Sequence, residues 1–532
     1  MNIPSRQDKM ARLAEPWDVL VIGGGITGAG ILLEASRRGL KALLVEGRDF
    51  AWGASSRSSK LVHGGLRYLT QGQIKVTRES VHERQVLLGD APGLIEPQSF
   101  AFAHYRDRKP NRRLLSLGLM IYDWLAGEQT RAHYPTDDFL MVAPHIATND
   151  LKGGSRYLEA KTDDARLVLR VLQEAQAAGG LALNYVTAAA LIREGDRVVG
   201  AQLIDTASGT AQDVRAKLVI NATGAWADRL RGQLGVAPKL RPLRGSHLIF
   251  PFWRLPVAQA VSLMHPWDDR PVFIYPWEGA TLVGTTDLDH PDLEGEPAIT
   301  SEEVAYLMAA LAFQFPQLAL TLDDVLSTYA GIRPVISTGK AEPSQEGRDH
   351  ACWLEHGLLT VTGGKLTTFR IIALDALKIA ASHLPRWQPN TGVHPIFRPA
   401  PALDANAGLR PGAGARLAGR YGGFAPLLVC AALPGELEPI GATDVLWAEL
   451  RWAARAEGVV RLEDLLLRRT RLGLLLRHGG AALLPRIRSI CQPELAWTDA
   501  QWEAEETAYR EVIRRYYSLP PGATIPRRQG TR

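Results

Sequence analysis

Cysteine is scarce in this sequence. The 532 residues include three cysteines, Cys352, Cys430 and Cys491, which lie far apart in the sequence. Without a Cys-x-x-Cys pair, the chain has neither the ligand spacing of a zinc knuckle nor the cysteine density of a disulfide-stabilised secreted domain. We therefore expect free thiols, no metal site and a reducing compartment that faces the cytosol.

Long uncharged apolar runs are also missing. No stretch approaches the ~20 residues that a helix needs to cross a bilayer. The polar segment 1–16 has no apolar core of a signal peptide. The sequence thus predicts neither a signal peptide nor a transmembrane helix, but it leaves peripheral attachment to a membrane open.

The charge is nearly balanced. A formal net charge of +5 at pH 7 is small for this length, and 46% hydrophobic with 22% charged residues is ordinary for a folded protein, which excludes intrinsic disorder. The length predicts about three domains. Basic residues are interleaved with leucine rather than arranged as an aromatic stacking platform, so nucleic acid is not an expected partner.

A glycine-rich turn follows the first predicted strand, the apolar run 17–22. The turn reads Gly23-x-Gly25-x-x-Gly28 and opens a helix, and Glu46 ends the next predicted strand. The first glycine permits the tight turn, the second admits a pyrophosphate, and the third allows close helix packing. The helix N-terminus favours phosphate, and an acid at the second strand end suits a ribose hydroxyl. This unit predicts a site for FAD or NAD.

The rest of the chain favours FAD. After the first βαβ unit, a polar loop of small residues covers 54–60, and an αβ pattern returns only near residue 160. A discontinuous nucleotide domain of this kind is typical of flavoproteins. Past about residue 389 the composition shifts, and amphipathic helices are predicted to about residue 517.

Eight motifs resemble, in order, those of the FAD-dependent glycerol-3-phosphate dehydrogenase family. Two look like the family signatures, IGGGITGAG (22–30) and GGKLTTFR (363–370). The six between them are SSKLVHGGLRY (58–68), DDARLV (163–168), NATGAW (221–226), GSH (245–247), GTTD (284–287) and GIRP (331–334). The stretch 449–471 is similar to the family's helical domain. Leu32, Glu34 and Phe369 stand where the family more often has Ala, Asp and Tyr.

This resemblance implies an α/β fold, α+β overall, with three parts. The first is a Rossmann-like FAD-binding domain of the glutathione-reductase/D-amino-acid-oxidase type, expected over 1–80, 152–226 and 331–388. The second is an inserted substrate or cap domain with an antiparallel sheet, over 81–151 and 227–330. The third is an all-α C-terminal domain over 389–520.

The resemblance also implies a reaction, the oxidation of sn-glycerol 3-phosphate to dihydroxyacetone phosphate with hydride transfer to flavin N5. The expected cofactor-binding residues are Gly23, Gly25, Gly28, Glu46, Ser58, Ser59, Gly65, Ala222, Thr223, Gly224, Gly363, Lys365, Leu366 and Thr367. The expected substrate-binding residues are Arg67, Tyr68, Arg333 and Lys365. Their three cations suit a phosphate dianion.

The catalytic residues are expected to be His63 and Arg333. His63 is the preferred base because an unperturbed imidazole pKa of about 6.5 suits proton abstraction at neutral pH. Arg333 is the rival for handling the substrate proton. His247 is a weaker candidate that we expect to be structural, and Asp287 is expected to order the substrate domain.

Two basic and apolar stretches are predicted to meet an anionic membrane surface. The first runs from Arg106 through Trp124, and the second covers 465–488, including Arg468, Arg469 and Arg471. We expect monotopic attachment to the cytoplasmic face of the cell membrane and a membrane quinone as electron acceptor. The alternatives are an oxygen-dependent glycerol-3-phosphate oxidase, an amine or amino-acid oxidase, and a non-catalytic flavin module. A homodimer stays open.

Overall fold

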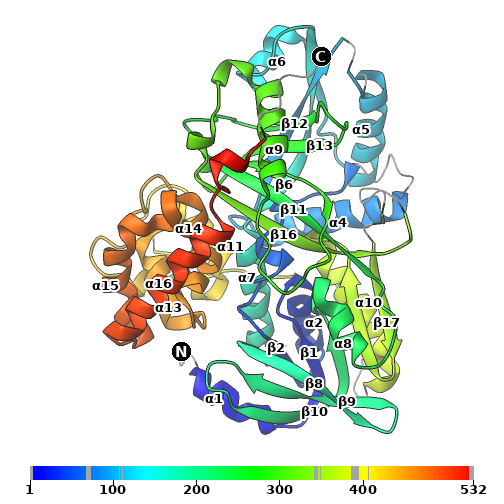
Figure 1. The fold of residues 1–532 in the computed structure, drawn as a ribbon, viewed down its shortest axis with the longest axis vertical. Helices are drawn as coiled ribbons and strands as arrows, with labels where there is room; N and C mark the ends of the chain where they lie inside the picture. The colour runs from blue at the N-terminus through cyan, green and yellow to red at the C-terminus, as the bar shows by residue number, and fades with distance from the viewer. Residues whose placement is uncertain are drawn as a thin grey trace.

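The computed structural model describes residues 4–66, 73–106, 108–110, 112–340, 346–347, 349–384, 395–404 and 407–526. Two sheets form the body of the molecule, one above the other in Figure 1, and the helices of the C-terminal part lie beside them. Mixed helix and strand content and a helical C-terminal part agree with the predicted fold class.

The first sheet has, among the described residues, eight strands in the order β17-β18-β10-β1-β2-β7, with the β8–β9 ribbon attached to β10. Its strands are β1 (Trp17–Ile22), β2 (Ala42–Glu46), β7 (Leu181–Asn184), β8 (Val186–Glu194), β9 (Arg197–Asp205), β10 (Ala211–Asn221), β17 (His350–Glu355) and β18 (Leu358–Gly363). All six residues of β1 are buried, because parallel neighbours lie on both sides and helices cover the sheet.

Three helices pack against this sheet and one another, namely α2 (Ile26–Arg37), α7 (Asp164–Ala177) and α10 (Phe369–Ile379). Phe369 is buried against Gly30, where a Cβ would approach its ring to 2.8 Å. The ring is a core element between α2 and α10, so the phenylalanine at this position is accounted for by packing.

The second sheet has, in the described part of the chain, ten strands in the order β15-β11-β14-β13-β12-β4-β6-β3, with β16 beside β11 and β5 beside β6. They are β3 (Leu61–Val62), β4 (Ile95–Tyr105), β5 (Ala132–Tyr134), β6 (Leu151–Thr162), β11 (Leu240–Pro251), β12 (Ala260–Met264), β13 (Pro271–Trp277), β14 (Ala280–Gly284), β15 (Leu288–Asp289) and β16 (Ser327–Ile336). Side chains of α6 (Thr136–Val142) and α9 (Ser301–Gln314) share one core with it.

The observed strands and helices differ from the predicted domain boundaries at three places. The strand β6 lies wholly in the second sheet, so residues 152–162 belong with the substrate part. The strand β16 pairs with β11 and starts before residue 331. The helix α4 (Ile74–Asp90) runs without a break across residue 80. Pairing partners far away in the sequence decide these memberships. The rest of the division stays a prediction.

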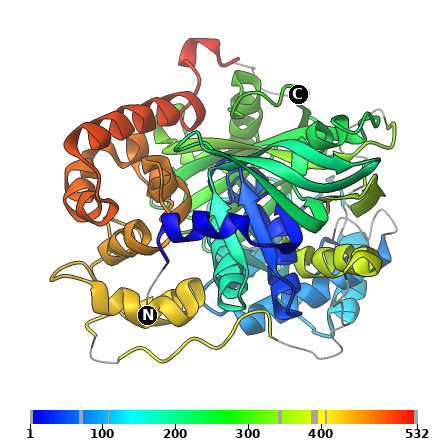
Figure 2. The same ribbon diagram turned by 90° about the horizontal axis from the view of Figure 1, so that it is seen from below.

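The C-terminal helices form the third part, along one side of the two sheets (Figure 2). They are α11 (Ala413–Tyr421), α12 (Ala425–Ala431), α13 (Trp447–Ala456), α14 (Leu472–Leu475), α15 (Leu484–Leu495) and α16 (Asp499–Tyr516), with a π-helical turn, η10 (Asp464–Arg469), before α14. They share an apolar core with one face of the second sheet, which includes Trp277, Tyr329, Leu466 and Trp502.

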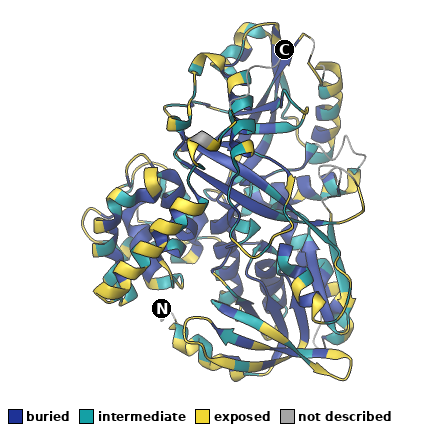
Figure 3. Ribbon diagram, viewed as in Figure 1, coloured by how far each residue is buried: buried dark blue, intermediate teal, exposed yellow. Residues whose placement is uncertain are grey.

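The prediction of a membrane surface over 465–488 is wrong for three of its six arginines, whereas Arg477 and Arg486 are exposed. The side chains of Arg468, Arg469 and Arg471 are at most 1% exposed, because all three pair with buried carboxylates of the FAD-binding part. Figure 3 shows this region as buried ribbon. The segment is a contact between parts of the molecule, since a charge is buried at acceptable cost only when it is paired.

The other predicted membrane segment is different. The helix α5 (Arg112–Ala126) lies at the edge of the second sheet, and much of its ribbon is coloured as exposed in Figure 3. It carries a row of exposed apolar side chains. The exposed members of this row are Leu114, Leu117, Met120, Ile121 and Trp124, the last of which is 78% exposed. Among the described residues, no helix combines the length and apolarity needed to cross a membrane.

Candidate active site

The carboxyl ends of β1 and β10 create a crevice where the strand order reverses. From β1 the chain passes to β2 on one side, and β10 lies on the other, with Ile22 in register with both Val45 and Asn221. Such switch points are where open α/β sheets bind ligands. Gly23, Gly25 and Gly28 follow β1 here, and Ala222, Thr223 and Gly224 follow β10.

Two of the motif glycines are required by close contacts. Gly23 has φ +116°, and a Cβ on it would lie 2.5 Å from the Ala222 carbonyl oxygen. A Cβ on Gly28 would lie 1.9 Å from the Gly23 carbonyl oxygen. The backbone of α2 therefore approaches the turn as closely as the motif requires, with its N-terminus at the crevice.

Glu46 lies beside the same turn. One carboxylate oxygen accepts a 2.7 Å hydrogen bond from the Gly24 N–H, and the other accepts one of 2.8 Å from the Arg48 N–H. Burial raises the pKa of this carboxyl. Glycines that admit close approach, a helix N-terminus and an acid at the second strand end fit the pyrophosphate and ribose of a dinucleotide such as FAD.

The two serines of the polar loop are held by different partners. Ser58 donates from its N–H and its hydroxyl to Asp164 Oδ2, at 3.0 and 2.7 Å. The Ser59 hydroxyl lies 2.9 Å from Nε2 of His247. The loop thus joins the N-terminal turn of α7 to β11 of the second sheet, and the predicted serines lie between the two sheets.

His63 follows β3 and lies next to the second family-like motif. Its carbonyl oxygen accepts a 3.3 Å hydrogen bond from the Thr367 hydroxyl. The following residue, Gly64, donates its N–H to Glu159 at 3.0 Å. Burial lowers the pKa of His63 to about 4, with Glu159 opposing the shift and the charge of Lys365 adding to it. The imidazole is therefore neutral at pH 7.

Lys365 follows two glycines in left-handed backbone conformations, Gly363 (φ +79°) and Gly364 (φ +72°). Its ammonium donates a 3.0 Å hydrogen bond to the Ser80 hydroxyl of α4. Burial lowers the pKa of Lys365 to about 7, although carboxylates including Asp349 and Glu159 oppose the shift. The charge of Lys365 lowers the pKa of His63, and Thr367 bonds the His63 carbonyl, so the structure brings together segments that are about 300 positions apart in the sequence.

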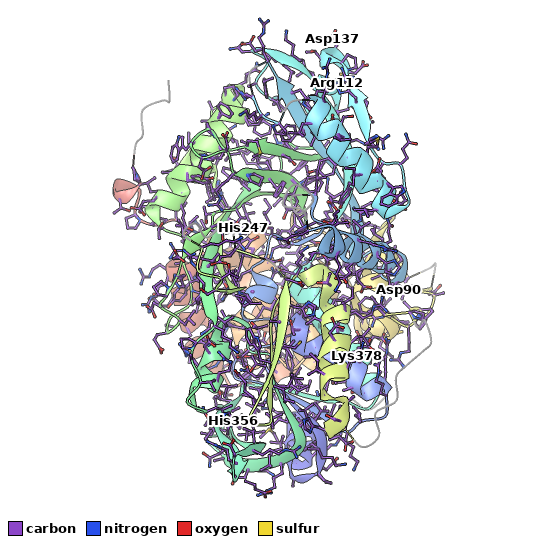
Figure 4. All side chains as sticks on the ribbon, turned by 90° about the vertical axis from the view of Figure 1, so that its right-hand side faces the viewer. Asp90, Arg112, Asp137, His247, His356 and Lys378 are labelled. Carbon is purple, nitrogen blue, oxygen red and sulfur yellow. The ribbon has the colours of Figure 1, made fainter. Side chains whose placement is uncertain are left out.

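Arg333 lies in β16 with the loop after β14. It donates to Asp287 Oδ1 at 2.9 Å, the Thr286 carbonyl at 3.2 Å and the Thr285 hydroxyl at 3.0 Å. Asp287 orients this guanidinium, and its expected role in ordering the substrate domain stays a prediction. Burial and the Arg333 charge hold the pKa of His247 well below its usual value. His247 lies between the two sheets in Figure 4, stacked on Tyr329 at 4.5 Å.

The remaining predicted residues surround these groups. Gly65 has φ +80° and follows the His63–Gly64 segment, and Leu366 and Thr367 form a short turn before α10. The predicted substrate residues Arg67 and Tyr68 lie outside the described residues.

Sequence reasoning missed several buried charged residues around the site. Lys60 is fully buried with φ +52°, and its ammonium lies 3.0 Å from Asp164. Glu159 accepts hydrogen bonds from Arg84 at 2.7 Å and from the Tyr122 hydroxyl at 2.6 Å. Asp164 stands in a quoted motif, which was a usable signal. Lys60 stands in another such motif, 58–68, whereas nothing in the local sequence distinguishes Glu159 from an exposed charge.

Comparisons with known proteins identify the class. The profile of the family described as FAD dependent oxidoreductase matches residues 18–370, and that of the C-terminal domain of alpha-glycerophosphate oxidase matches 396–502. With the crevice described above, these matches define an oxidoreductase that uses FAD.

Comparison with individual relatives assigns the chain to one family within this class of oxidoreductases. Glycerol-3-phosphate dehydrogenase 2 of Mycobacterium tuberculosis (strain H37Rv) is 34% identical, over 93% of this chain and 88% of its own. The aerobic glycerol-3-phosphate dehydrogenase of Bacillus subtilis is 38% identical, over 69% and 67%. A crystal structure of the Bacillus halodurans glycerol-3-phosphate dehydrogenase complexed with FAD matches 96% of this chain and 97% of its own, at 28% identity and a TM-score of 0.74. The chain belongs to the FAD-dependent glycerol-3-phosphate dehydrogenase family.

Proposed function

We propose that the protein oxidises sn-glycerol 3-phosphate to dihydroxyacetone phosphate and passes the electrons to a membrane quinone. The observation that carries the reaction is that the His63 carbonyl accepts a hydrogen bond from Thr367, two residues after the partly buried Lys365, so that a neutral imidazole and an amine meet at the N-terminal side of α10. Family membership supplies the substrate, because the dehydrogenases to which the chain is similar are named for it.

Each side chain of the site is assigned one role in the proposed reaction. Bound FAD supplies the acceptor for the hydride that leaves C2 of the substrate. His63 takes the proton of the C2 hydroxyl, since its imidazole is neutral at pH 7. Lys365 and Arg333 bind the phosphate, and Asp287 keeps the guanidinium oriented. Arg67 and Tyr68 complete the phosphate site.

The proposal of a membrane quinone as the electron acceptor rests on helix α5. Its exposed apolar row lies beside Arg112 and Arg113 at the start of the helix, where Figure 4 labels Arg112. A helix with apolar side chains next to cations binds the boundary of an anionic bilayer, with its apolar face among the acyl chains. Attachment there brings the enzyme to a lipid-soluble quinone. This supports the predicted location on the cytoplasmic face of the membrane.

Oxygen is the competing acceptor. The profile that matches 396–502 is named for an alpha-glycerophosphate oxidase, so an oxidase with the same first half-reaction is the second candidate. Stoichiometric hydrogen peroxide during turnover in air would favour the oxidase.

The deciding experiment is anaerobic mixing of the FAD-loaded protein with sn-glycerol 3-phosphate, followed at the flavin absorbance. We expect bleaching, and reoxidation by added quinone that is faster than reoxidation by oxygen. His63→Ala should reduce flavin at least a hundredfold more slowly, a typical loss for a general base, whereas Arg333→Ala should mainly weaken substrate binding. An unbleached flavin would refute the proposed reaction, and a wild-type rate in His63→Ala would refute the role of the histidine.

A further inference from the structure

The loop 56–60 is held by buried charged groups on the side of the FAD-binding part. Lys60 donates from its ammonium to the Ser56 carbonyl and to Asp164 Oδ1, both at 3.0 Å. Ser58 bonds the other oxygen of the same carboxylate. Asp164 therefore fixes the middle of the loop and Lys60 at its end, and the Lys60 ammonium ties the Ser56 end to the same carboxylate.

The opposite side of the loop meets the second sheet. The Tyr329 hydroxyl donates to the Ser58 carbonyl at 2.9 Å, and the Tyr275 hydroxyl donates to the Ser59 carbonyl. With the bond between Ser59 and His247, every residue from Ser58 to Lys60 is tied to a buried partner. A shift of this backbone would displace the residues predicted to contact the cofactor.

The third partner comes from the C-terminal helices. Arg471 Nη2 donates to the Ser56 carbonyl at 2.7 Å and to Asp164 Oδ1 at 2.9 Å. Its other terminal nitrogen donates to the Leu467 carbonyl at 2.7 Å, so the guanidinium is fixed from its own side. The Arg471 backbone has φ +62°, the left-handed region that non-glycine residues seldom adopt. This strained conformation is held where the guanidinium meets the loop.

We propose that Arg471 is a positioning residue that fixes the loop 56–60 against Asp164, so that the C-terminal helical part completes the flavin site. In its link to catalysis, this inference rests on the proposed function. In the proposed role, Arg471 contacts neither the substrate nor the flavin. It acts through Ser56 and Asp164, and from there on Ser58, Ser59 and His247.

The pKa of Lys60 responds to the same charged groups that hold the loop 56–60. Burial lowers the pKa of Lys60 to about 8, and the nearby charge of Arg471 adds to the shift, while Asp164 and Asp163 oppose it. The charged groups that face Lys60 thus come from α7 and from the C-terminal part, and the rings of Trp277 and Tyr329 lie within 5.0 Å of its ammonium.

The test compares Arg471→Met and Arg471→Lys with two matched controls. Arg469→Met breaks a buried ion pair between the same two parts of the molecule, but its partner Asp49 lies outside the loop. Arg477→Met removes an exposed arginine near Arg471 in the sequence. All proteins are stripped of FAD and titrated with FAD, the dissociation constant and the flavin spectrum are recorded, and flavin reduction is then followed at equal FAD occupancy.

We expect Arg471→Met to weaken FAD binding at least tenfold and to alter the flavin spectrum. It should also slow flavin reduction at saturating substrate at least tenfold. Arg471→Lys should recover most of each loss, because it keeps the charge. Both controls should stay within about threefold of the wild type, although Arg469→Met lowers the melting temperature.

Equal FAD affinity and spectrum in Arg471→Met and the wild type would overturn the inference, and so would equal losses in Arg471→Met and Arg469→Met. If Arg471→Met does not fold, Ser58→Ala replaces it, since it removes one hydroxyl bond to Asp164 and should also weaken FAD binding. A wild-type flavin that glycerol 3-phosphate does not bleach would refute the proposed reaction, while the FAD titrations would still decide the role of Arg471.

Discussion

Lys365 titrates in the pH range where a cytosolic enzyme works. Burial lowers its pKa to about 7, so the free protein holds this side chain as a mixture of ammonium and amine near neutral pH. In the proposed phosphate site, only the ammonium form of Lys365 would attract the substrate phosphate. Substrate binding is therefore expected to depend on pH through this residue, in a range where the neutral His63 does not change its charge.

We predict that KM for glycerol 3-phosphate rises as the pH increases above about 7, approaching tenfold per pH unit, as the ammonium is lost. Lys365→Met should raise KM at pH 6.5 by roughly 10–100-fold, the value of one charge-assisted hydrogen bond, and should remove this pH dependence. Steady-state kinetics from pH 6 to 9 provide the measurement. A rise in KM above pH 7 that persists in Lys365→Met would assign the titration to another group.

Among the single elements, helix α5 has a buried inner face that contacts the site and an exposed outer face that is apolar. Its inner face buries Tyr122, whose hydroxyl bonds Glu159, which in turn holds the Gly64 N–H beside His63. Its outer face presents the exposed apolar row. The helix that we propose to contact the membrane is thus anchored, through one carboxylate, to the segment that carries the proposed base.

We predict that Leu117→Glu and Trp124→Glu each lower binding to anionic phosphatidylglycerol vesicles at least tenfold. Each replaces an apolar side chain whose burial is worth about 1.5–3 kcal/mol. Leu433→Glu is the matched control, because Leu433 is 55% exposed on the C-terminal part. Vesicle sedimentation at low and high salt measures the effect. Equal binding by all three variants and the wild type would exclude α5 as the contact.

Prediction from sequence succeeded where the signal is local. The strand Trp17–Ile22 was predicted from an apolar run of six adjacent residues. The glycine turn and Glu46 were predicted in the same way, because one βαβ unit contains all of their geometry.

The segment 465–471 shows why the rest could not be predicted. Three leucines followed by three arginines around Thr470 give the same sequence signal whether the arginines meet lipid phosphates or buried carboxylates. Their partners Asp49 and Asp164 lie 420 and 307 residues away from Arg469 and Arg471, respectively. The hydrogen bonds of Glu159 likewise join residues up to 95 positions apart, so only the assembled sheets identify this carboxylate as part of the site.

At the scale of the whole molecule, Asp49 joins the FAD-binding part to the C-terminal helices. It accepts hydrogen bonds from Arg468 at 2.6 Å and from Arg469 at 2.6 and 2.8 Å. Burial opposes ionisation, but the two guanidinium groups overcome it and lower the pKa of Asp49 to about 2. Because the folded pKa lies below the unfolded one, this carboxylate stabilises the fold above about pH 4, and that contribution is lost as the pH falls toward 2.

We predict that Asp49→Asn removes about 2–3 kcal/mol of stability at pH 6 and lowers the melting temperature by roughly 2–3 °C. The difference from the wild type should shrink to about half at pH 3, where the native carboxylate begins to protonate. Glu194→Gln, which breaks an exposed pair with Arg215, is the control and should change stability by at most about 1 kcal/mol. Thermal unfolding at several pH values measures both. A difference that does not change with pH would contradict the assignment.

The contact between Asp164 and Arg471 also sets an order of events during synthesis. The two residues are 307 positions apart. At roughly 5–20 residues per second, the ribosome needs about 15–60 s to make the intervening chain. Throughout that interval the nascent protein holds Asp164, Lys60 and Ser58 without the guanidinium that closes the cluster. On the role proposed for Arg471, the cofactor pocket is begun by the first few dozen residues and completed only after residue 471 has been made, so tight capture of FAD is expected to wait for the C-terminal helices.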